Sequence, residues 1–523
     1  LRERLPALHL EVLPTALGQT AAVARAVNAA GPPLVVVLAP GVEPQPGWLA
    51  PLARAFDDPE VLGAAPVLRA LDGTLVSAGP AFPPDGAPEP FLAGFPVEDA
   101  AFLAGRPLNA VNGPAVAFRA ADLAGTDLAG TSASEVGDEF AWADVSLSLA
   151  ARRPGHFVTC LASSVVVRHA WAGGDWDRAA FAVRWPQRPA DAADLWRWAG
   201  FELVNGDVRR LPVQVREGIP NLRWAIKNPA TPLTRGERWG DTYFCRRLAE
   251  ALRRIGQTVA IDHREAFDRA SGRHDDVTLV IRGLTPYTPW TEAINLAWLI
   301  SHPELMTAQE AARYHRVFAA GPAWAAAHSQ KWGVRIDPLL QATDPALFHP
   351  DRAAPDTGPP VLFVGSARDG QREIVRQATD AGLTVTAWGG GWDGHLPPDQ
   401  IGGEYLPNEE LGAAYRAAGI VLNDHWADMR NGGFVSNRVF DAAAAGARVI
   451  TDDVAGLADL AEVFGRSVQI AHDSADVRRL AADLSVFGDD TERRAVAARV
   501  HAEHSFDARA RVLLDAALEL RNT

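Results

Sequence analysis

Short apolar runs alternate with helical patterns over residues 1–172, which predicts a layered α/β unit. Leu34 to Leu38 is an uninterrupted, β-branched apolar run, typical of a strand buried on both faces. Residues 48–56 have the apolar spacing of a helix. Further strands are predicted over residues 61–67, 74–77 and 115–118. Proline and glycine are dense from residue 79 to 96, which predicts a surface loop.

Residues 173–220 lie in a tryptophan-rich stretch, which we interpret as a helical connector between domains. Because exposed tryptophans are unfavourable, we expect most of them to pack at an interface. The tryptophans in and beside this stretch are Trp171, Trp176, Trp185, Trp196 and Trp198.

Two further α/β units follow, which predicts an α/β protein with two doubly wound, Rossmann-like domains after a partial first domain. The predicted domains span residues 221–355 and 356–523. A helix is expected over residues 241–255. Strands are predicted over 222–226, 258–262, 277–281, 361–365, 384–387, 420–422, 448–451 and 468–470. Two such sheets form a cleft where their carboxyl ends meet, and ligands bind there.

Charge and cysteine content exclude several classes of protein. The chain of 523 residues carries a formal net charge of −14, which disfavours nucleic acid as a partner. Its two cysteines, Cys160 and Cys245, fit a reducing compartment. No signal-peptide pattern follows Leu1, and no apolar stretch approaches the ~20 residues of a membrane helix. We therefore expect a cytoplasmic protein, and leave association with the inner face of the membrane open.

The most informative segment runs from Gly432 to Asp453. Glycines lead into Ser436 or Asn437 as a helix N-cap, an alanine-rich helix follows, and Gly446 ends it. Free amides and the positive end of a helix dipole suit a diphosphate, and Arg438 would add a charge-assisted contact. The alternative is an ordinary Rossmann-like crossover, which has the same glycine-rich start and alanine-rich helix.

The run from Ser436 through Arg438 and Phe440 to Gly446 resembles the donor-binding region of family-4-like glycosyltransferases with the GT-B fold. The resemblance is greatest to the group related to the spore maturation protein CgeB. Residues 361–366, and the stretches 404–415 and 420–424, also resemble that group.

This resemblance implies a set of donor-binding residues, to which His425 and Arg430 are added as cleft candidates by their position after a predicted strand. They are Gly365, Arg368, Arg372, Asn423, His425, Arg430, Gly433, Phe434, Ser436, Asn437, Arg438 and Asp441. In many family-4 enzymes two glutamates lie eight positions apart, and the second contacts the ribose. Here these positions hold Gly433 and Asp441, so the resemblance implies a ribose contact at Asp441 and leaves the stereochemical course open.

Two residues of the preceding domain are candidates for the acceptor side. Asp241 precedes a predicted helix, where it would cap the helix or act as a base, with capping the favoured role. His302 follows an apolar strand, so we expect it near the cleft. Its imidazole suits proton transfer from an acceptor hydroxyl, although a histidine beside a proline is more often structural.

Residues 28–49, 112–119 and 137–149 resemble family-2 glycosyltransferases with the GT-A fold. The family's metal-binding Asp-x-Asp element is replaced by Ala39, Pro40 and Gly41. Of its base-carrying Glu-Asp pair only the aspartate is kept, as Asp144 after Ala143, and His169 matches its later metal-binding histidine. The family's first strand and nucleotide-binding loop would precede Leu1. We interpret residues 1–172 as a degenerate module with a structural or acceptor-binding role.

The two resemblances together imply a glycosyltransferase that uses a nucleotide-diphosphate sugar, with no metal and no further cofactor. The implied acceptor is a glycan or lipid-linked glycan in bacterial surface polysaccharide or glycoconjugate synthesis. A GT-B-fold nucleotide-sugar epimerase and a non-catalytic binding scaffold are the alternatives. The sequence does not indicate the donor, the acceptor or the oligomeric state.

Overall fold

The computed structural model describes residues 34–38, 41–84, 88–111, 115–124, 145, 148–149, 152–168, 181, 183, 185–290, 292–355, 357–368 and 372–522. The chain divides into two compact units. The first comprises Leu1–Val213 with Asp268–His274, and the second comprises Gln214–Phe267 with Asp275–Thr523.

The first unit is built on a mixed sheet with the strand order β1-β7-β3-β8-β2, in which β4 also pairs with β3. The strands are β1 (Leu34–Leu38), β2 (Val42–Pro44), β3 (Val61–Arg69), β4 (Leu75–Ser77), β7 (Ala115–Arg119) and β8 (Phe157–Arg168). Among the described strands of this sheet, β3 and β8 pair in parallel and the other pairs are antiparallel. The helices are α2 (Leu49–Ala55), α3 (Ala120–Ala124), α6 (Ala192–Trp198) and the 3₁₀ segments Val97–Leu103 and Ala270–His274.

Strand β1 differs from the prediction of a strand buried on both faces. It pairs with β7 and ends the strand order of the described sheet. Val36 is 38% exposed and Leu38 is 47% exposed. The apolar run therefore predicted the strand correctly but not its place at the edge of the described sheet.

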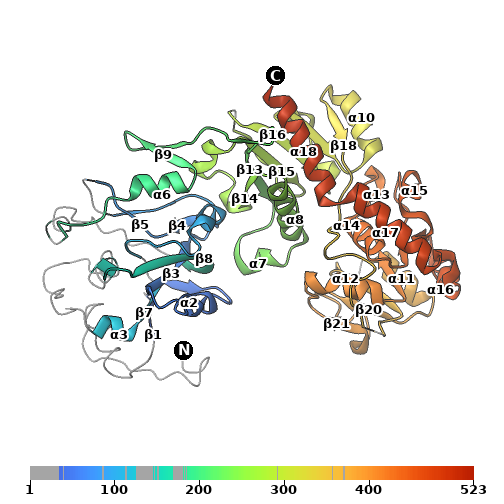
Figure 1. Cartoon of the computed structure of the whole chain (residues 1–523). Helices are drawn as coiled ribbons and strands as arrows, with labels where there is room; N and C mark the ends of the chain where they lie inside the picture. The colour runs from blue at the N-terminus through green and yellow to red at the C-terminus, as the bar shows by residue number, and fades with distance from the viewer. Residues whose placement is uncertain are drawn as a thin grey trace. The chain divides into compact units, whose positions relative to one another are not determined.

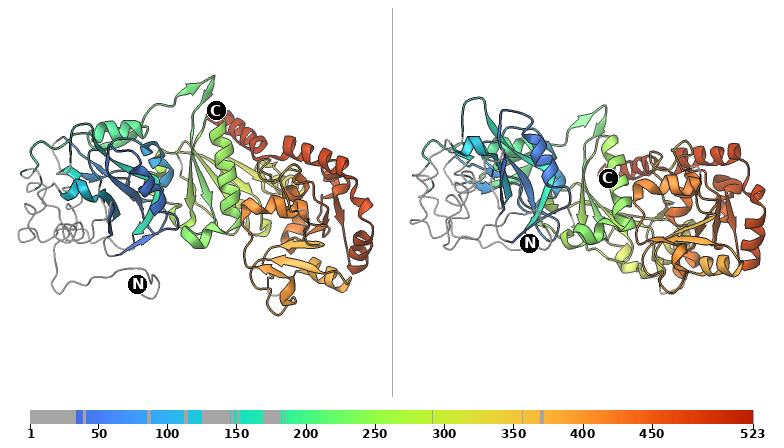
Figure 2. Two further views of the ribbon diagram at one scale, coloured as in Figure 1. Left: turned by 60° about the horizontal axis from the view of Figure 1, so that its bottom comes forward. Right: turned by 90° about the horizontal axis from the view of Figure 1, so that it is seen from below.

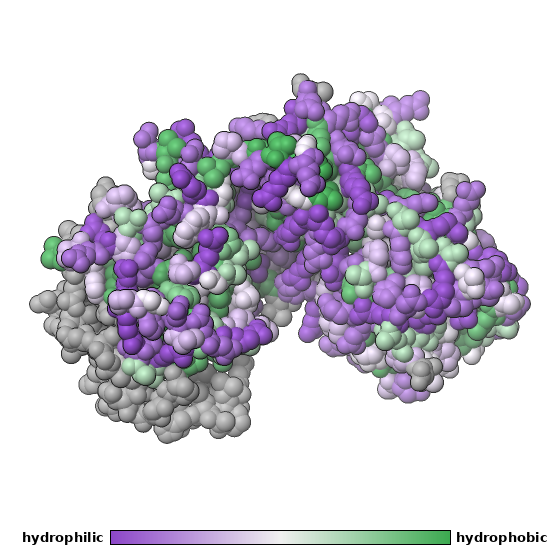
Figure 3. Space-filling model, in the orientation of Figure 1, coloured by the Kyte–Doolittle hydropathy of each residue, from purple (hydrophilic) through white to green (hydrophobic). Residues whose placement is uncertain are grey.

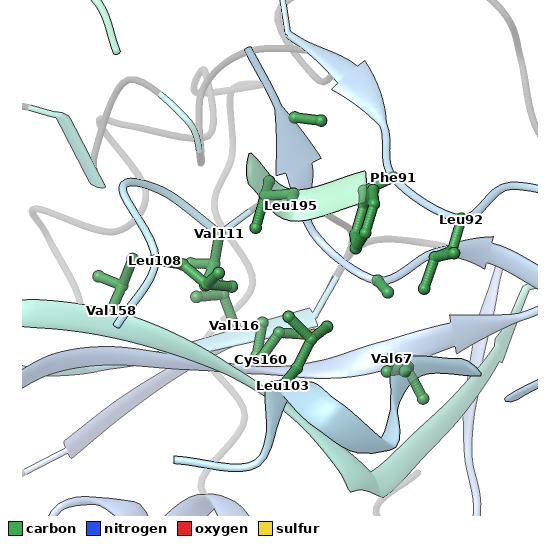
Figure 4. Close-up of a cluster of buried hydrophobic side chains, with 14 of the residues drawn as sticks. Val67, Phe91, Leu92, Leu103, Leu108, Val111, Val116, Val158, Cys160 and Leu195 are labelled. Carbon is green, nitrogen blue, oxygen red and sulfur yellow. The ribbon is translucent and has the colours of Figure 1, made fainter. Parts of the chain in front are cut away.

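The segment from residue 79 to 96 is not a surface loop. It contains the short strands β5 (Pro80–Ala81) and β6 (Glu89–Pro90), and it buries Phe91 and Leu92 almost completely. Figure 4 shows these two side chains in the same cluster as Val67 and Leu195. Apolar side chains between the prolines and glycines draw this segment onto the core, because their burial removes apolar surface from water.

The stretch predicted as a helical connector is only partly helical among its described residues. After α6 come the hairpin of β9 (Phe201–Val204) with β10 (Asp207–Arg210) and, in the second unit, that of β11 (Val215–Arg216) with β12 (Ile219–Pro220). Trp196 packs inside the first unit, with its ring 5.0 Å from that of Phe91. Trp171 and Trp176 lie outside the described residues.

The second unit contains two entirely parallel six-stranded sheets, which confirms the predicted α/β class with two doubly wound domains. The strand orders are β14-β13-β15-β16-β17-β18 and β21-β20-β19-β22-β23-β24. The first sheet has β13 (Arg223–Asn228), β14 (Thr258–His263), β15 (Val277–Arg282), β16 (Ile294–Leu299), β17 (Arg316–Ala319) and β18 (Ile336–Pro338). The second has β19 (Val361–Val364), β20 (Val385–Trp388), β21 (Ile401–Gly403), β22 (Ile420–Asn423), β23 (Val449–Thr451) and β24 (Val468–Ile470).

Helices connect these strands as crossovers. Around the first sheet they are α7 (Leu233–Glu237), α8 (Gly240–Arg254), α9 (Ala308–Ala311) and α10 (Pro322–Trp332), with 3₁₀ segments at Arg264–Ala266 and Pro303–Leu305. Around the second sheet they are α11 (Glu373–Asp380), α12 (Asn408–Ala417), α13 (Ala427–Gly432), α14 (Asn437–Ala444), α15 (Ala461–Phe464) and α16 (Ser474–Ala482). Further 3₁₀ segments are Pro398–Gln400, Ala458–Leu460, Gly465–Ser467 and Leu484–Phe487.

The last two helices, α17 (Asp490–His504) and α18 (Phe506–Arg521), return the chain from the second sheet to the first. Figures 1 and 2 show α18 beside α8. Phe506 at the start of α18 packs edge-to-face on Phe244 of α8, with 5.0 Å between the ring centroids. Phe244 in turn contacts Trp298 of β16 at 5.0 Å. Aromatic burial therefore fixes the returning helix to the first sheet.

The buried guanidinium of Arg509 in α18 holds the linker between the two sheets. Its Nε donates to the carbonyl of Leu340 at 2.7 Å, and its Nη2 donates to that of Gln341 at 3.0 Å. Nη2 also lies 2.6 Å from Nδ1 of His504. Burial lowers the pKa of Arg509 to about 10, and burial together with this neighbouring charge lowers the pKa of His504 to about 4. His504 is therefore neutral near pH 7 and accepts the bond.

The surface shown in Figure 3 is mostly hydrophilic, with hydrophobic side chains in separate small groups. Among the described residues, every helix is too short or too polar to cross a membrane. Cys160 and Cys245 are both free and buried.

Replacing Arg509 should destabilise the second unit strongly. Arg509→Ala leaves buried carbonyls of the linker without a donor, so we expect the free energy of unfolding to fall by about 3 kcal/mol. The matched control is Arg511→Ala, an exposed arginine two residues further along the same helix. Urea denaturation measures the free energy of unfolding of both variants. An equal loss in the two would contradict the role of Arg509 in holding the linker.

Candidate active site

A cavity of about 520 Å³ lies within the second unit, where the carboxyl ends of the two sheets meet. This volume is within the range of small-molecule sites. The first sheet contributes Asp241, Gly283 and His302 with their neighbours, and the second contributes residues after β19, after β22 and at the start of α14. The sequence-predicted residues that line the cavity are Asp241, His302, Arg368, His425, Ser436, Asn437, Arg438 and Asp441.

Strand order places the cavity here. In the second sheet β19 lies between β20 and β22, so the crossovers on its two sides run in opposite directions. In the first sheet the same reversal occurs at β13, between β14 and β15. Ligands of open parallel sheets bind at the carboxyl ends of strands at such a reversal. Residues just after β13, β15, β16 and β22 accordingly line the cavity.

Helix α14 begins at the cavity, and its first backbone amides are free to donate hydrogen bonds. Ser436 is its N-cap, but its side chain caps no backbone amide. The hydroxyl of Ser436 instead donates to Oδ1 of Asn423 at 2.8 Å. A helix cannot satisfy its own first amides, so those of Asn437 and Arg438 are available to an anion, aided by the helix dipole.

His425 supports this helix terminus from behind. The backbone amide of Ser436 donates to Nε2 of His425 at 2.9 Å, so that nitrogen carries no proton. Nδ1 therefore carries the proton and donates to Oδ1 of Asp452 at 2.6 Å. Both ring nitrogens are occupied and the ring is fully buried. His425 thus orients the start of α14, and its ring is not free to bind a sugar-nucleotide donor.

Three arginines gather around the loop after β19. A Cβ on Gly365 would lie 3.0 Å from Nη2 of Arg372 and 3.1 Å from Nη2 of Arg438, so this glycine leaves room for both guanidiniums. Arg438 donates to Oδ1 of Asn423 at 2.8 Å, and the guanidinium carbon of Arg368 lies 3.4 Å from the ring centroid of Trp426. Burial lowers the pKa of Arg368 and of Arg372 to about 10, so both remain charged at neutral pH.

Arg372 and Asn423 act behind the cavity and do not line it. Arg372 is buried and pairs with Asp424, with Nη1 2.5 Å from Oδ1. Asn423 is fully buried and donates to Oγ1 of Thr451 at 2.9 Å while accepting from Ser436 and Arg438. Both residues therefore hold others that face the cavity.

Three further residues predicted to bind the donor lie away from the cavity lining. Phe434 is fully buried and packs on Trp324, with 5.8 Å between ring centroids. Arg430 is 42% exposed and points toward Asp452 at 3.8 Å. Gly433 ends α13 with a φ of 74°, and a Cβ there would lie 2.5 Å from the carbonyl oxygen of Ala455. The missing family glutamate thus corresponds to a position where any side chain collides with backbone.

Asp441 lies at the floor of the cavity. Its Oδ1 accepts from the hydroxyl of Thr343 at 2.7 Å and its Oδ2 accepts from Nδ2 of Asn437 at 2.7 Å. Burial raises the pKa of Asp441 to about 8, and the two hydrogen bonds only partly oppose that shift. At neutral pH Asp441 is therefore largely protonated.

His302 also lines the cavity, and it has a left-handed backbone conformation with a φ of 52°. Its ring centroid lies 5.8 Å from that of Trp426. Its Nδ1 lies 3.3 Å from Oδ2 of Asp428, which belongs to α13 of the second sheet. Asp241 is not a helix cap: α8 begins at Gly240 after the N-cap Trp239, and Asp241 is its second residue. Burial raises the pKa of Asp241, and the nearby charge of His302 opposes this.

Sequence reasoning did not identify four residues that shape the site. Asp428 lies beside His302, Asp452 orients His425, and Arg368 stacks on the ring of Trp426. Tyr243 of α8 lines the cavity, and its hydroxyl bonds to that of Tyr405 beside the second sheet. Asp428 and Trp426 could have been predicted, because they follow β22 closely and that strand ends at the cleft. No sequence pattern indicated the tyrosine pair.

The candidate residues of the first unit cannot be placed in the same way. Asp144, His169, Ala39 and Pro40 lie outside the described residues. Gly41 is described, with a φ of 78° and open space around its missing side chain. The predicted degenerate module therefore stays a prediction.

Comparison with models of known protein families finds one match. Residues 368–515 match the family model described as Glycosyl transferase-like. This stretch contains most of the donor-side cavity residues. The match supports a transferase enzyme with glycosyltransferase function, as the sequence predicted. A search of curated proteins finds no match.

Several solved structures of glycosyltransferases are similar at low identity. AviGT4, a glycosyltransferase involved in avilamycin A biosynthesis, is 16% identical, with 57% of this chain and 98% of that chain covered and a TM-score of 0.39. T4 phage β-glucosyltransferase is 16% identical, with 56% and 98% covered and a TM-score of 0.37. WaaG, a glycosyltransferase involved in lipopolysaccharide biosynthesis, is 11% identical, with 56% and 99% covered and a TM-score of 0.38.

The raised pKa of Asp441 predicts a pH dependence of stability. Between the usual aspartate pKa near 4 and the folded value of about 8, the folded protein holds a proton that the unfolded chain has lost. This group's contribution is complete at low pH and disappears as the pH rises through the folded pKa. The free energy of unfolding of the wild type should therefore fall relative to Asp441→Asn from pH 5 to pH 8, by up to about 1 kcal/mol per pH unit.

Urea denaturation of both proteins at each pH measures this difference. Asp399→Asn, which changes an exposed aspartate of the same domain, should follow the wild type throughout. A constant difference between the wild type and Asp441→Asn would show that Asp441 does not titrate in this range.

Proposed function

We propose that the chain transfers a sugar from a nucleotide-diphosphate sugar to a glycan acceptor, without a metal at the diphosphate. One observation carries the proposal: a single cavity is lined by the start of helix α14 with Arg368 and Arg438, and also by His302 and Asp241. Anion-binding groups and proton-transfer groups thus line the same space of ligand size. This is the arrangement that donor activation and acceptor deprotonation require.

The donor side neutralises the leaving group. Negative charge develops on the diphosphate as the glycosidic bond breaks, and Arg368, Arg438 and the first amides of α14 are positioned to stabilise it. Asn423 orients Arg438, and His425 orients the helix terminus, so these donors are fixed before the ligand binds. The available positive charge supports the proposal of metal independence. Asp441 is proposed to contact the ribose.

The acceptor side supplies a base. Nδ1 of His302 faces Asp428, which leaves Nε2 as the nitrogen available to an acceptor hydroxyl. We propose that Nε2 accepts the hydroxyl proton as the sugar is transferred, while Asp428 stabilises the imidazolium that forms. Asp241 is the second candidate for contact with the acceptor.

The lining of the cavity supports a glycan acceptor. Trp239 and Leu284 line it from the first sheet and are 36% and 58% exposed. Exposed aromatic and aliphatic side chains at a cavity suit the apolar faces of sugar rings, while the polar groups around them suit the hydroxyls. We propose by resemblance alone that the acceptor belongs to a bacterial surface glycan and that the enzyme acts in the cytoplasm.

Two finer assignments also rest on sequence resemblance. The second unit is proposed to be related to the CgeB-like group. The first unit is proposed to be a degenerate family-2-like module with a structural or acceptor-binding role. An epimerase would rearrange the donor without any acceptor, so analysing the products formed from donor alone separates that function from transfer.

The proposal is tested first by nucleotide binding. A thermal-shift panel of UDP, GDP, dTDP and CMP, with and without Mn²⁺, should show one nucleotide that raises the melting temperature equally in both conditions. Absence of any shift would favour the scaffold alternative. A shift that requires Mn²⁺ would contradict a metal-independent donor site.

Arg438→Gln should weaken binding of that nucleoside diphosphate at least tenfold, because a charge-assisted bond to phosphate contributes about 1.5–3 kcal/mol. Isothermal titration calorimetry measures the affinity. The control is Arg376→Gln, the same change at an exposed arginine of α11, which should bind like the wild type. Unchanged affinity in Arg438→Gln would remove this residue from the donor site.

His302→Asn should lower kcat about 10²–10⁴-fold while leaving donor affinity nearly unchanged, because a general base acts on the acceptor proton. Steady-state kinetics with donor and acceptor measure kcat, and calorimetry measures donor affinity. Full activity would assign the base to Asp241 or another group. Loss of donor affinity equal to the loss of kcat would indicate a role in binding.

A further inference from the structure

A histidine and two carboxylates converge at the edge of the cavity, from elements of both sheets. His302 and Glu304 follow β16, and Asp428 lies in α13. One potential ligand atom from each residue lies within 4.8 Å of the others. The proposed transfer reaction uses His302 and Asp428 but gives no role to Glu304.

The distances do not fit ordinary hydrogen bonds. Nδ1 of His302 lies 3.4 Å from Oε1 of Glu304 and 3.3 Å from Oδ2 of Asp428. A charge-assisted bond between such groups would measure about 2.7–2.9 Å. Two ligands that each lie ~2.1 Å from a tetrahedral ion are about 3.4 Å apart. The spacing of these two pairs therefore fits ligand atoms around a shared cation, and the third pair lies within 4.8 Å.

One oxygen of the cluster also lacks a hydrogen bond. Oδ2 of Asp428 is buried and has no hydrogen-bond partner among the described residues. A bound dication would supply a partner for this oxygen.

We propose that His302, Glu304 and Asp428 form a binding site for a transition-metal dication of the Zn²⁺ class. One imidazole nitrogen with two carboxylate oxygens is a ligand set that Zn²⁺ accepts, whereas Mg²⁺ prefers oxygen ligands and keeps its water. The remaining coordination positions would be filled by water or substrate oxygen. Such an ion would bridge the two sheets at the mouth of the cavity.

An ion bound at this site would inhibit the transfer reaction, and this consequence rests on the proposed function. Metal on Nδ1 of His302 withdraws electron density from the ring and separates it from Asp428, so Nε2 becomes a poorer proton acceptor. The transfer reaction would therefore run without metal and slow when Zn²⁺ binds. The binding site itself does not depend on the base role of His302.

Calorimetric titration of the tag-free full chain with ZnCl₂ and, separately, MgCl₂ tests the site. Zn²⁺ should bind with one site and Mg²⁺ much more weakly. Glu304→Gln, at a side chain that is 49% exposed and outside the transfer machinery, should weaken Zn²⁺ at least about tenfold without changing basal activity. His395→Ala, which removes an exposed histidine elsewhere in the unit, should bind Zn²⁺ like the wild type.

Equal Zn²⁺ affinity in the wild type and Glu304→Gln, or no binding by the wild type, would overturn the site. Binding that is lost in Glu304→Gln supports it. Inhibition by Zn²⁺ that Glu304→Gln relieves supports both the site and the base. Binding without inhibition keeps the site and counts against His302 as the base, so the two proposals fail separately.

Discussion

The linker that joins the two parallel sheets is held by the bend between α17 and α18, and the cavity depends on this contact. Arg509 donates to carbonyls of the linker, and the amide of Thr343 donates to the carbonyl of His504 at 2.8 Å. The hydroxyl of Thr343 then reaches Asp441 at the floor of the cavity. Because one residue bonds to the returning helices and to the site, the packing of α18 on α8 and the geometry of the cavity are physically connected.

A second constraint is the preorganisation of the donor side. Asp452 holds His425, His425 holds the amide of Ser436, and Asn423 holds both Ser436 and Arg438. His425 and Asn423 are buried and their partners are partly buried, so these bonds are made in surroundings of reduced dielectric and each depends on the others. The helix terminus is therefore rigid before a ligand arrives. In contrast, Arg368 is positioned by stacking on the ring of Trp426.

Local patterns predicted the second unit well and the first unit less well. Strands such as β19 and β22 are buried on both faces, so they appear as plain apolar runs, and all the strands predicted after residue 220 are present. Burial of β1 and of the segment around Phe91 depends on distant partners, which a local pattern does not contain. The site shows the same division. The start of α14 could be predicted from the sequence. The ion pair of Arg372 with Asp424 and the approach of His302 to Asp428 form only when the chain folds.

The turn at Gly433 bears on how the site can change over evolutionary time. Its amide contacts the carbonyl of Arg430, the same carbonyl accepts from Ala455, and a Cβ would strike the Ala455 oxygen. A change to an acidic residue at this position is therefore not a single neutral step: the Ala455 loop must first move away. Such an ordering of substitutions is sign epistasis, and it makes an acid hard to acquire here while the loop stays docked.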